Sequence, residues 1–253
     1  MPTPPDLSAL HPLSHLPADA PLDAKLDRAR LILEVTATSP GFLAANAAVA
    51  FTGGKDSSVV LTLWAETLTA QMCGPLRAIS VDTGFKFPQV TAFRDKLCDQ
   101  LNVELILARP QVDLAGYPVA QNKLSCCRDL KIVPLGTALA GSDTTVLFTG
   151  IRRDEHPSRA ARPYVELRPA TETTPEHWQV NPILDWTEID IWAFITGRGL
   201  PYCELYHEGY RSLGCMPCTT PCEGCVLGDE GERAGRDQDK ERQLDALKSL
   251  GYF

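Results

Sequence analysis

Short apolar runs alternate with stretches of helical periodicity over most of the chain. The apolar runs that we predict as strands are residues 48–52, 77–83, 104–108 and 145–150. The stretches that we predict as helices are residues 22–37, 57–70, 88–101 and 127–140. Because the runs are short, apolar and rich in β-branched residues, they indicate parallel strands covered on both faces. The alternation predicts a doubly wound, mostly parallel α/β sheet with ligands at the carboxyl ends of its strands.

The pattern changes in the last third of the chain. Residues 180–184 lead into a further predicted helix, with Thr187 as its N-cap and Asp190 three residues later. Beyond Tyr202 the chain is rich in Gly, Pro and Cys. We therefore expect three parts, which are a Pro-rich leader over residues 1–21, an α/β domain over 22–202 and a Cys-rich extension with a C-terminal tail over 203–253.

The first predicted strand runs through a glycine turn into a helix, with the sequence Thr52-Gly53-Gly54-Lys55-Asp56-Ser57-Ser58. Two glycines let the backbone approach an anion, and the first N–H groups of the helix point toward it. Lys55 and the two serine hydroxyls complete a cradle for phosphate. The spacing differs from the Walker P-loop, which has four residues between its first glycine and the Gly-Lys pair. A plain surface turn that caps the helix is the alternative.

Polar side chains also follow the second and fourth predicted strands. Asp82 and Thr83 end the second strand, so we expect them to face the same ligand as the glycine turn. Asp82 offers oxygen ligands for Mg²⁺ or a bond to a ribose, and a structural turn is the alternative. Gly150 follows the fourth strand and precedes three arginines whose planar forks suit phosphate and sulfate, Arg152, Arg153 and Arg159. A solvated loop is the alternative for these arginines.

Composition narrows the class of protein. The hydrophobic fraction of 44% is that of an ordinary globular chain, and we find neither a signal peptide nor a membrane span. The expected location is therefore cytoplasmic, without a membrane partner. A net charge of −8 argues against a general electrostatic grip on nucleic acid, so a DNA or RNA role would need a partner. A homo-oligomer is left open.

Nine cysteines are many for a chain in a reducing compartment, where clustered thiols indicate metal or redox chemistry. Four of them form an adjacent pair and a C-x-x-C pair, and these are Cys126, Cys127, Cys215 and Cys218. Four thiolates are the number that an iron–sulfur cubane takes from its protein. A second C-x-x-C pair follows, Cys222 and Cys225, which leaves open a local zinc site made with Cys215 and Cys218. In the cluster assignment, the second pair is left for redox chemistry or sulfur relay.

Several segments resemble known families. The glycine turn resembles the PP-loop of ATP pyrophosphatases, usually Ser-Gly-Gly-Lys-Asp-Ser, with Thr52 in place of the first serine. Residues 123–128 and 209–219, around the cluster cysteines, resemble segments of the iron–sulfur sulfonucleotide reductases. Residues 81–88, 232–236 and 250–253 resemble the small subunit of bacterial sulfate adenylyltransferase, which implies a tail that closes over the nucleotide.

Taken over about residues 42–253, the resemblance identifies the chain as a member of the phosphoadenosine-phosphosulfate-reductase superfamily of PP-loop proteins. It implies an adenine nucleotide alpha hydrolase-like fold, with the nucleotide-binding domain over residues 22–202. The implied nucleotide-binding residues are Thr52, Gly53, Gly54, Asp56, Ser57, Ser58, Asp82, Thr83, Gly150 and Arg159.

The families imply different reactions. Dedicated sulfonucleotide reductases commonly lack the loop lysine and carry a nucleophilic cysteine in a C-terminal Glu-Cys-Gly-Leu-His motif. This chain keeps Lys55 and has no such motif. We therefore expect a 4Fe-4S enzyme that cleaves ATP to AMP and pyrophosphate and adenylylates an acceptor in sulfur transfer or assimilation. It would be similar to the ATP pyrophosphatase of DNA phosphorothioation systems.

In this interpretation Lys55, Arg152 and Arg153 neutralise phosphate charge as the α-phosphorus is attacked, and Mg²⁺ shares that task. The expected partners are an adenine nucleotide and a sulfur donor protein, either a cysteine desulfurase or a thioredoxin-like protein, with a DNA-modifying complex reached through partners. The first alternative is a thiol-dependent reductase of adenylylsulfate or its phosphorylated form, which uses Cys222 or Cys225 and releases sulfite. The second is a non-catalytic iron–sulfur nucleotide sensor.

Overall fold

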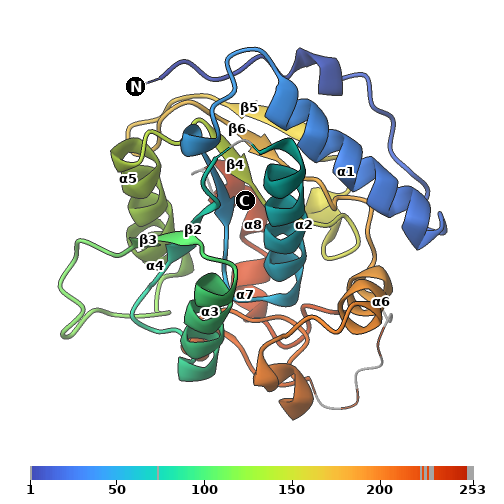
Figure 1. Cartoon of the computed structure of the whole chain (residues 1–253). Helices are drawn as coiled ribbons and strands as arrows, with labels where there is room; N and C mark the ends of the chain where they lie inside the picture. Colours follow the sequence, from blue (N-terminus) through green and yellow to red (C-terminus); the bar gives the residue numbers. More distant parts are fainter. Residues whose placement is uncertain (1, 73, 223, 225–226, 228–230, 250–253) are drawn as a thin grey trace.

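Six strands form one sheet in the order β3-β2-β1-β4-β6-β5 (Figure 1). The computed structural model describes residues 2–72, 74–222, 224, 227 and 231–249. The strands are β1 (Ala47–Ala50), β2 (Arg77–Val81), β3 (Glu104–Ala108), β4 (Val146–Phe148), β5 (Val165–Arg168) and β6 (His177–Val180). All neighbours pair in parallel except β5, which runs antiparallel to β6 at the edge. The predicted doubly wound, mostly parallel sheet is confirmed.

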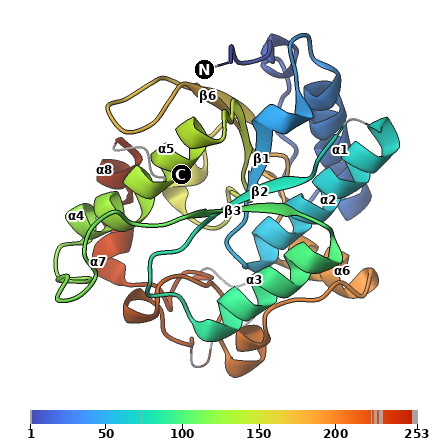
Figure 2. The ribbon, with the colours of Figure 1, turned by 60° about the vertical axis from the view of Figure 1, so that its left-hand side comes forward.

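Helices cover both faces of this sheet, as Figure 2 shows. One face packs against α1 (Leu22–Thr38), α2 (Lys55–Gln71), α3 (Pro88–Gln100) and α6 (Glu188–Gly197) in the larger hydrophobic core. The other face packs against α5 (Val133–Gly141) through a smaller core. Short helices complete the chain, namely α4 (Lys123–Cys127), α7 (Gln238–Glu241) and α8 (Leu244–Ser249). No helix in the described part of the chain is both long and apolar enough to cross a membrane.

Burial explains why the central strands were readable from sequence. Every residue of β1 and β4 is buried, as an apolar run between two helical layers requires. Helix α6 also begins as predicted, because Thr187 and Asp190 form a reciprocal capping box. The leader is part of the same packing, since Leu7 and Leu10 are buried in the larger core. The division into three parts stays a prediction.

Two regions differ from the predicted pattern. The expected helix over residues 127–140 begins earlier, at Lys123, and is interrupted by a π-helical turn over Arg128–Ile132 before α5. The β5–β6 hairpin is missing from the predicted elements. Its strands mix apolar residues with charged ones such as Glu166 and Arg168, so they lack the continuous apolar run that marks the central strands.

The topology fixes where a ligand can bind. Strands β1 and β4 are neighbours, yet the chain leaves β1 through α2 and reaches β4 from α5 on the opposite face. In open α/β sheets the crevice at such a switch point, outside the carboxyl ends of the strands, takes the ligand. The residues that follow β1, β2 and β4 therefore meet at one edge, and the C-terminal tail lies against that edge.

Candidate active site

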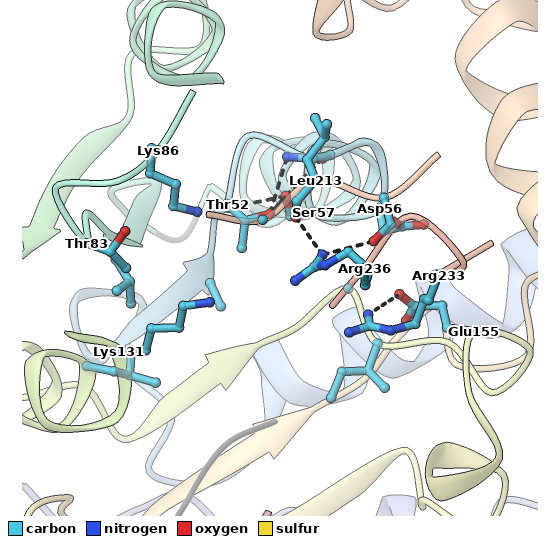
Figure 3. A pocket seen from close by; sticks show the side chains of 18 of the residues that line it. Thr52, Asp56, Ser57, Thr83, Lys86, Lys131, Glu155, Leu213, Arg233 and Arg236 are labelled. Atoms are coloured by element: carbon cyan, nitrogen blue, oxygen red, sulfur yellow. Dashed lines mark hydrogen bonds and ion pairs between the residues drawn. The ribbon is translucent and has the colours of Figure 1, made fainter. Parts of the chain in front are cut away.

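A cavity of about 170 Å³ opens at this carboxyl edge (Figure 3). It is lined by the turns that follow β1, β2 and β4, by α5 and its preceding turn, and by residues from the Cys-rich extension and tail. One part of its wall is apolar, with Ala50, Val81 and Leu135. The predicted site residues that line it are Thr52, Gly54, Asp56, Ser57, Thr83, Gly150 and Arg159.

The glycine turn is held tightly by its own hydrogen bonds. Gly53 has φ +80°, and a Cβ there would lie 2.9 Å from Val90 Cγ1, so only glycine fits this turn without strain. The Thr52 hydroxyl accepts the Gly54 N–H at 3.2 Å. The Ser57 and Ser58 hydroxyls both donate to the Gly54 carbonyl, at 2.9 and 3.0 Å. These hydroxyls therefore brace the turn against α2.

A second glycine brings β4 close to this turn. A Cβ on Gly150 would lie 2.9 Å from both the Asp56 carbonyl carbon and the Ser57 nitrogen. Real Cβ atoms do not approach backbone so closely, so any larger residue must push β4 away from the start of α2. Gly150 thus sets the width of the crevice at the switch point.

Lys55 is buried beside the cavity rather than exposed in it, with 1% of its surface accessible. Its Nζ pairs with Asp56 Oδ2 at 3.3 Å and with Glu232 Oε1, and it donates to the Arg211 carbonyl at 3.1 Å. Its backbone N–H donates to the Tyr206 hydroxyl at 2.8 Å. Burial alone would lower the pKa of Lys55, but Asp56 and Glu232 raise that pKa above its ordinary value.

Arg152 lies beside Lys55 and is completely buried. It pairs with Asp56 Oδ1 at 2.7 Å, with Asp154 and with Glu232 Oε2. Burial opposes its charge, while Asp56 and Glu232 hold its pKa well above the ordinary value. The guanidinium is thus an integral part of a buried charge network.

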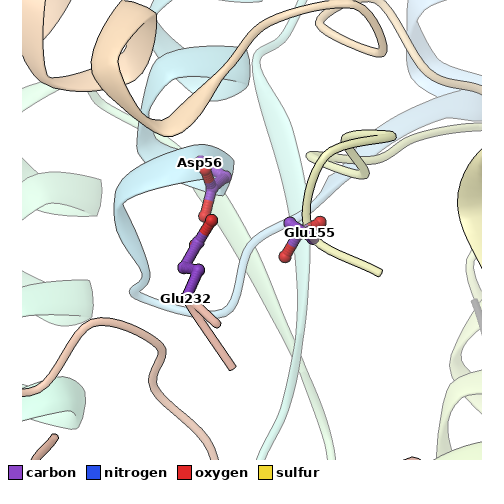
Figure 4. A group of neighbouring side chains, drawn as sticks. All are labelled: Asp56, Glu155 and Glu232. Carbon is purple, nitrogen blue, oxygen red and sulfur yellow. The ribbon is translucent and has the colours of Figure 1, made fainter. Parts of the chain in front are cut away.

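Three carboxylates of this network come together, as Figure 4 shows. Asp56, Glu155 and Glu232 each offer an oxygen within 4.8 Å of the others. Their charges are matched by nearby cations, because Glu155 pairs with Arg159 and with Arg233 while the other two pair with Lys55 and Arg152. Burial favours protonation of Glu155, but Arg159 and Arg152 lower its pKa well below the ordinary value. As arranged, these carboxylates form an ion-pair network with lysine and arginine partners.

Two predicted site residues lie elsewhere. Arg153 turns away from the cavity, pairs with Asp185 at 3.3 Å and donates to the Arg162 carbonyl at 3.2 Å. Asp82 lies outside the cavity wall, with Oδ2 3.9 Å from Arg109 Nε. The structure therefore does not bring either to the predicted ligand, because Arg153 pairs with Asp185 and Asp82 faces Arg109.

The four predicted cluster cysteines come from two segments at this edge. Cys126 and Cys127 lie on α4, and Cys215 and Cys218 bracket a short turn; all four are free thiols. Cys215 Sγ lies 3.3 Å from the Thr83 hydroxyl, which lines the cavity. Burial opposes ionisation of Cys215, but Lys131 and Lys86 lower its pKa to about 6. Four free thiols, one of them already favoured as a thiolate, fit the donor set of an iron–sulfur cluster.

The second C-x-x-C pair is not described in full. Cys222 is disulfide-bonded, and Cys225 lies outside the described residues. A zinc site would need four ligands within bonding reach of one ion. Among the described residues, no group of three cysteines brings its sulfurs within 4.8 Å of one another.

Sequence reasoning missed several residues that the fold brings to the cavity. Lys86 and Lys131 reach in from one side, and Arg233 and Glu155 lie on the other (Figure 3). Lys131 comes from the interrupted helix, where no motif marks it. The tail was marked by its resemblance, but nothing local indicated that Glu232 pairs with the glycine-turn lysine.

The fold and this edge define a class, that of nucleotide-binding α/β proteins with an adenine nucleotide alpha hydrolase-like sheet. Residues 46–221 match the model of the phosphoadenosine phosphosulfate reductase domain. The chain belongs to this family.

Two relatives and one solved structure show the range of similarity. The chain is 38% identical over 122 residues to an adenosine 5'-phosphosulfate reductase of Neisseria meningitidis, covering 48% of this chain and 46% of that protein. It is 32% identical over 178 residues to a phosphoadenosine 5'-phosphosulfate reductase of Xanthomonas axonopodis pv. citri, and this match covers 67% of this chain and 69% of that protein. Thus it spans about half the length of the Neisseria relative that it matches.

The solved structure is a phosphoadenylyl-sulfate reductase from Candida auris in its phosphate complex. Its TM-score is 0.62 at 21% identity, covering 82% of this chain and 100% of that one, which shows the shared fold. The two bacterial relatives favour the predicted reductase alternative over the adenylylating enzyme, and they give no support to a specific likeness to DNA phosphorothioation proteins.

Proposed function

We propose that the protein is a sulfonucleotide reductase of sulfur assimilation, which binds adenylylsulfate or its 3'-phosphorylated form and releases sulfite. The observation that carries this proposal is a cavity wall with Lys86 and Lys131 beside the free thiol of Cys215. Cations and a thiol cluster then lie next to the place where the anionic end of such a nucleotide would bind. The relatives of known activity support the same class of reaction.

The cavity offers suitable surroundings for each part of the substrate. The apolar wall with Val81 and Leu135 suits an adenine ring, and the cations of the opposite walls suit phosphate and sulfate oxygens. Asp56 and Glu155 also line the cavity, but both pair with lysine and arginine side chains. Lys86 and Lys131 line the other side of the cavity, where the anionic end of the substrate would lie.

The residues that would hold an iron–sulfur cluster are Cys126, Cys127, Cys215 and Cys218. A cluster held there would supply a polarisable metal centre beside the sulfate end of the substrate. The protein's own contribution is electrostatic, because Lys131 and Lys86 keep Cys215 in the ligating thiolate form.

Reduction needs two thiols. A thiolate attacks the sulfur of the sulfonucleotide, the bond from sulfur to the phosphate oxygen breaks, and AMP or its 3'-phosphate leaves. A second thiolate then attacks the cysteine sulfur of this Cys–S–SO3⁻ intermediate, the bond between the two sulfurs breaks, a disulfide forms and sulfite leaves. We assign the first thiolate to the pair Cys222 and Cys225, after a thioredoxin-like protein or glutathione as the electron donor has reduced the disulfide of Cys222.

One observation favours a second candidate, the cleavage of ATP to AMP and pyrophosphate with adenylylation of an acceptor. The complete turn Thr52–Ser58 keeps Lys55, and Arg152 lies against it, so two cations are available for phosphates if their carboxylate partners move away. In that case a cysteine desulfurase would be a suitable sulfur donor. A nucleotide sensor without turnover would show binding and neither product.

The deciding experiment is anaerobic purification followed by parallel assays for sulfite from adenylylsulfate with a thiol donor and for pyrophosphate from ATP. We expect sulfite, and we expect Cys225→Ser to abolish it while Cys98→Ser, a buried thiol on α3, does not. Pyrophosphate release that is abolished by Lys55→Ala, without sulfite, would refute the reductase and establish the second candidate. Iron and sulfide content, expected at about four of each per chain, tests the cluster separately.

A further inference from the structure

Glu232 is the anion that the buried cations beside the glycine turn bind in this structure. One carboxylate oxygen pairs with Lys55 Nζ and the other with Arg152 Nη2, so a single anion bridges both buried cations of the turn. The side chain is 5% exposed and comes from the tail, 177 residues away from Lys55 in sequence. A carboxylate that bridges a lysine and an arginine copies the charge and the contacts of a phosphate group.

Two backbone donors of the turn are occupied as well. The Lys55 N–H, which starts α2 and would point at a bound anion, donates to the Tyr206 hydroxyl. The Gly54 N–H donates to Thr52 Oγ1. A polyphosphate that binds this turn must therefore displace both Glu232 and the Tyr206 hydroxyl.

The ion pairs of Glu232 make that displacement unfavourable. A phosphate that takes its place must separate this carboxylate from both Lys55 and Arg152, and leaving a buried carboxylate without its cations is costly. A sulfonucleotide carries one anionic group beyond the α-phosphate, where ATP carries two. Its anionic end can use the wall with Lys86 and Lys131 and leave the turn unchanged.

We propose that Glu232 is a specificity-determining residue, which excludes nucleoside triphosphates by filling the phosphate position of the glycine turn. The proposal rests on the proposed function in one respect, that the accepted ligand is a sulfonucleotide. It explains why a chain with the complete turn sequence and Lys55 belongs to a family whose named members are sulfonucleotide reductases.

The test compares binding of three probes to the full chain, namely adenylylsulfate without thiol donor, ATP and inorganic pyrophosphate. Glu232→Gln keeps the shape of the side chain and removes its charge, and Glu232→Ala also opens the space. We expect ATP and pyrophosphate to bind at least about tenfold more tightly to both variants, because the two cations lose their internal anion. The affinity for adenylylsulfate should change by less than about threefold.

The matched control is Glu166→Gln. Glu166 lies on the edge strand β5 and pairs with the buried Arg162, so this substitution removes the same charge from another ion pair. It should leave all three affinities unchanged. Thermal unfolding of each variant shows whether it is folded. If Glu232→Ala does not fold, Glu232→Gln, which preserves the shape of the side chain, is sufficient for the test.

Two outcomes would overturn the inference. One is wild-type protein that binds ATP as tightly as Glu232→Gln does, and the other is equal tightening for ATP and adenylylsulfate. The proposed function fails separately, through the absence of sulfite from the wild-type protein. A gain of ATP binding in Glu232→Gln would then still show that Glu232 blocks the turn.

Discussion

The two ends of the cavity use the same kinds of cation for different purposes. The loop end consists of Lys55, Asp56, Arg152, Glu155 and Glu232, and the thiol end consists of Thr83, Lys86, Lys131 and Cys215. At the loop end, carboxylates of the chain bind the cations in a buried network. At the thiol end, Lys131 and Lys86 lower the pKa of a cysteine. The comparison teaches that a binding motif in the sequence shows where cations gather. Whether a ligand can bind those cations depends on the side chains that pair with them in the fold.

Burial gives the two ends different energetic roles. Removing one member of a buried ion pair leaves an uncompensated charge, which is strongly destabilising even where the complete pair contributes little. A cation that faces a cavity acts mainly on the ligand and on nearby titrating groups. Substitutions at the loop end should therefore affect stability, and substitutions at the thiol end should affect binding.

The largest effect is expected for Arg152→Met. It removes the buried guanidinium that pairs with Asp56 and Glu232 and leaves these two carboxylates to share Lys55, so the free energy of unfolding should fall by about 3–5 kcal/mol. Denaturant unfolding at pH 7 measures it, and Arg242→Met, in an exposed pair with Asp239, should change stability by less than about 0.5 kcal/mol. Adding Glu232→Gln to Arg152→Met should recover part of the loss. A loss below about 1 kcal/mol would contradict the description of the loop end as one network.

Gly150→Ala tests the close approach that holds the loop end in place. The new Cβ would meet the backbone of Asp56 and Ser57 at 2.9 Å, which should destabilise the protein by about 1–3 kcal/mol. Gly141→Ala is the matched control, because a Cβ there meets nothing within 4 Å and should leave stability unchanged or slightly raised. Equal effects at both glycines would show that the loss of glycine's backbone freedom, and not the contact with α2, determines the result.

The central sheet and the glycine turn could be predicted from local sequence, because both depend on residues that are neighbours in the chain. The buried strands β1 and β4 are apolar in every position, and the strand, glycines and helix of the turn follow one another directly. The β5–β6 hairpin was not predicted, since its polar residues such as Glu166 and His177 break the apolar pattern at the sheet edge. The fold class could thus be predicted, although the strands β5 and β6 at the edge of the sheet could not.

The site was predicted less completely, because the residues that contact one another there are distant in sequence. Tyr206 and Glu232 bind Lys55 from 151 and 177 residues away, and no local pattern shows such a contact. The arginine segment after β4 shows the same limit, since Arg152 joins the loop end while the adjacent Arg153 pairs with Asp185. Residue type predicted the presence of cations, but only the fold shows which carboxylates neutralise them.

The tail that carries Glu232 is itself held by a charge pair, which gives a pH-dependent test. Arg233 donates two hydrogen bonds to Glu241, at 2.6 and 2.9 Å. Burial favours protonation of Glu241, but the bonds from Arg233 lower its pKa below the ordinary value. Glu241→Gln should therefore cost about 1–2 kcal/mol at pH 7.

The sign of the pH dependence follows from that lowered pKa. The stabilisation by Glu241 is fully present above its unfolded-state pKa of about 4.3 and is lost as the pH falls through the folded-state pKa. Unfolding measured from pH 7 to pH 3 should show the difference between wild type and Glu241→Gln constant at first and shrinking below about pH 4. A difference that stays constant to pH 3 would show that the substitution disturbs packing rather than charge. Asp239→Asn, in an exposed pair, is the control and should show almost no difference.

The smallest effect on stability is expected at the thiol end, for Lys131→Met. The change in unfolding free energy should stay within about 0.5 kcal/mol, because the side chain faces the cavity. Adenylylsulfate should nevertheless bind about tenfold more weakly, and the affinity should depend less on salt, because one cation of the ligand-facing wall is gone. Titrations at two salt concentrations measure both effects, with the exposed Lys96→Met as control. Unchanged affinity together with a large loss of stability would reverse the assignment of the two ends, since Lys131 would then act as part of a structural network like that around Lys55.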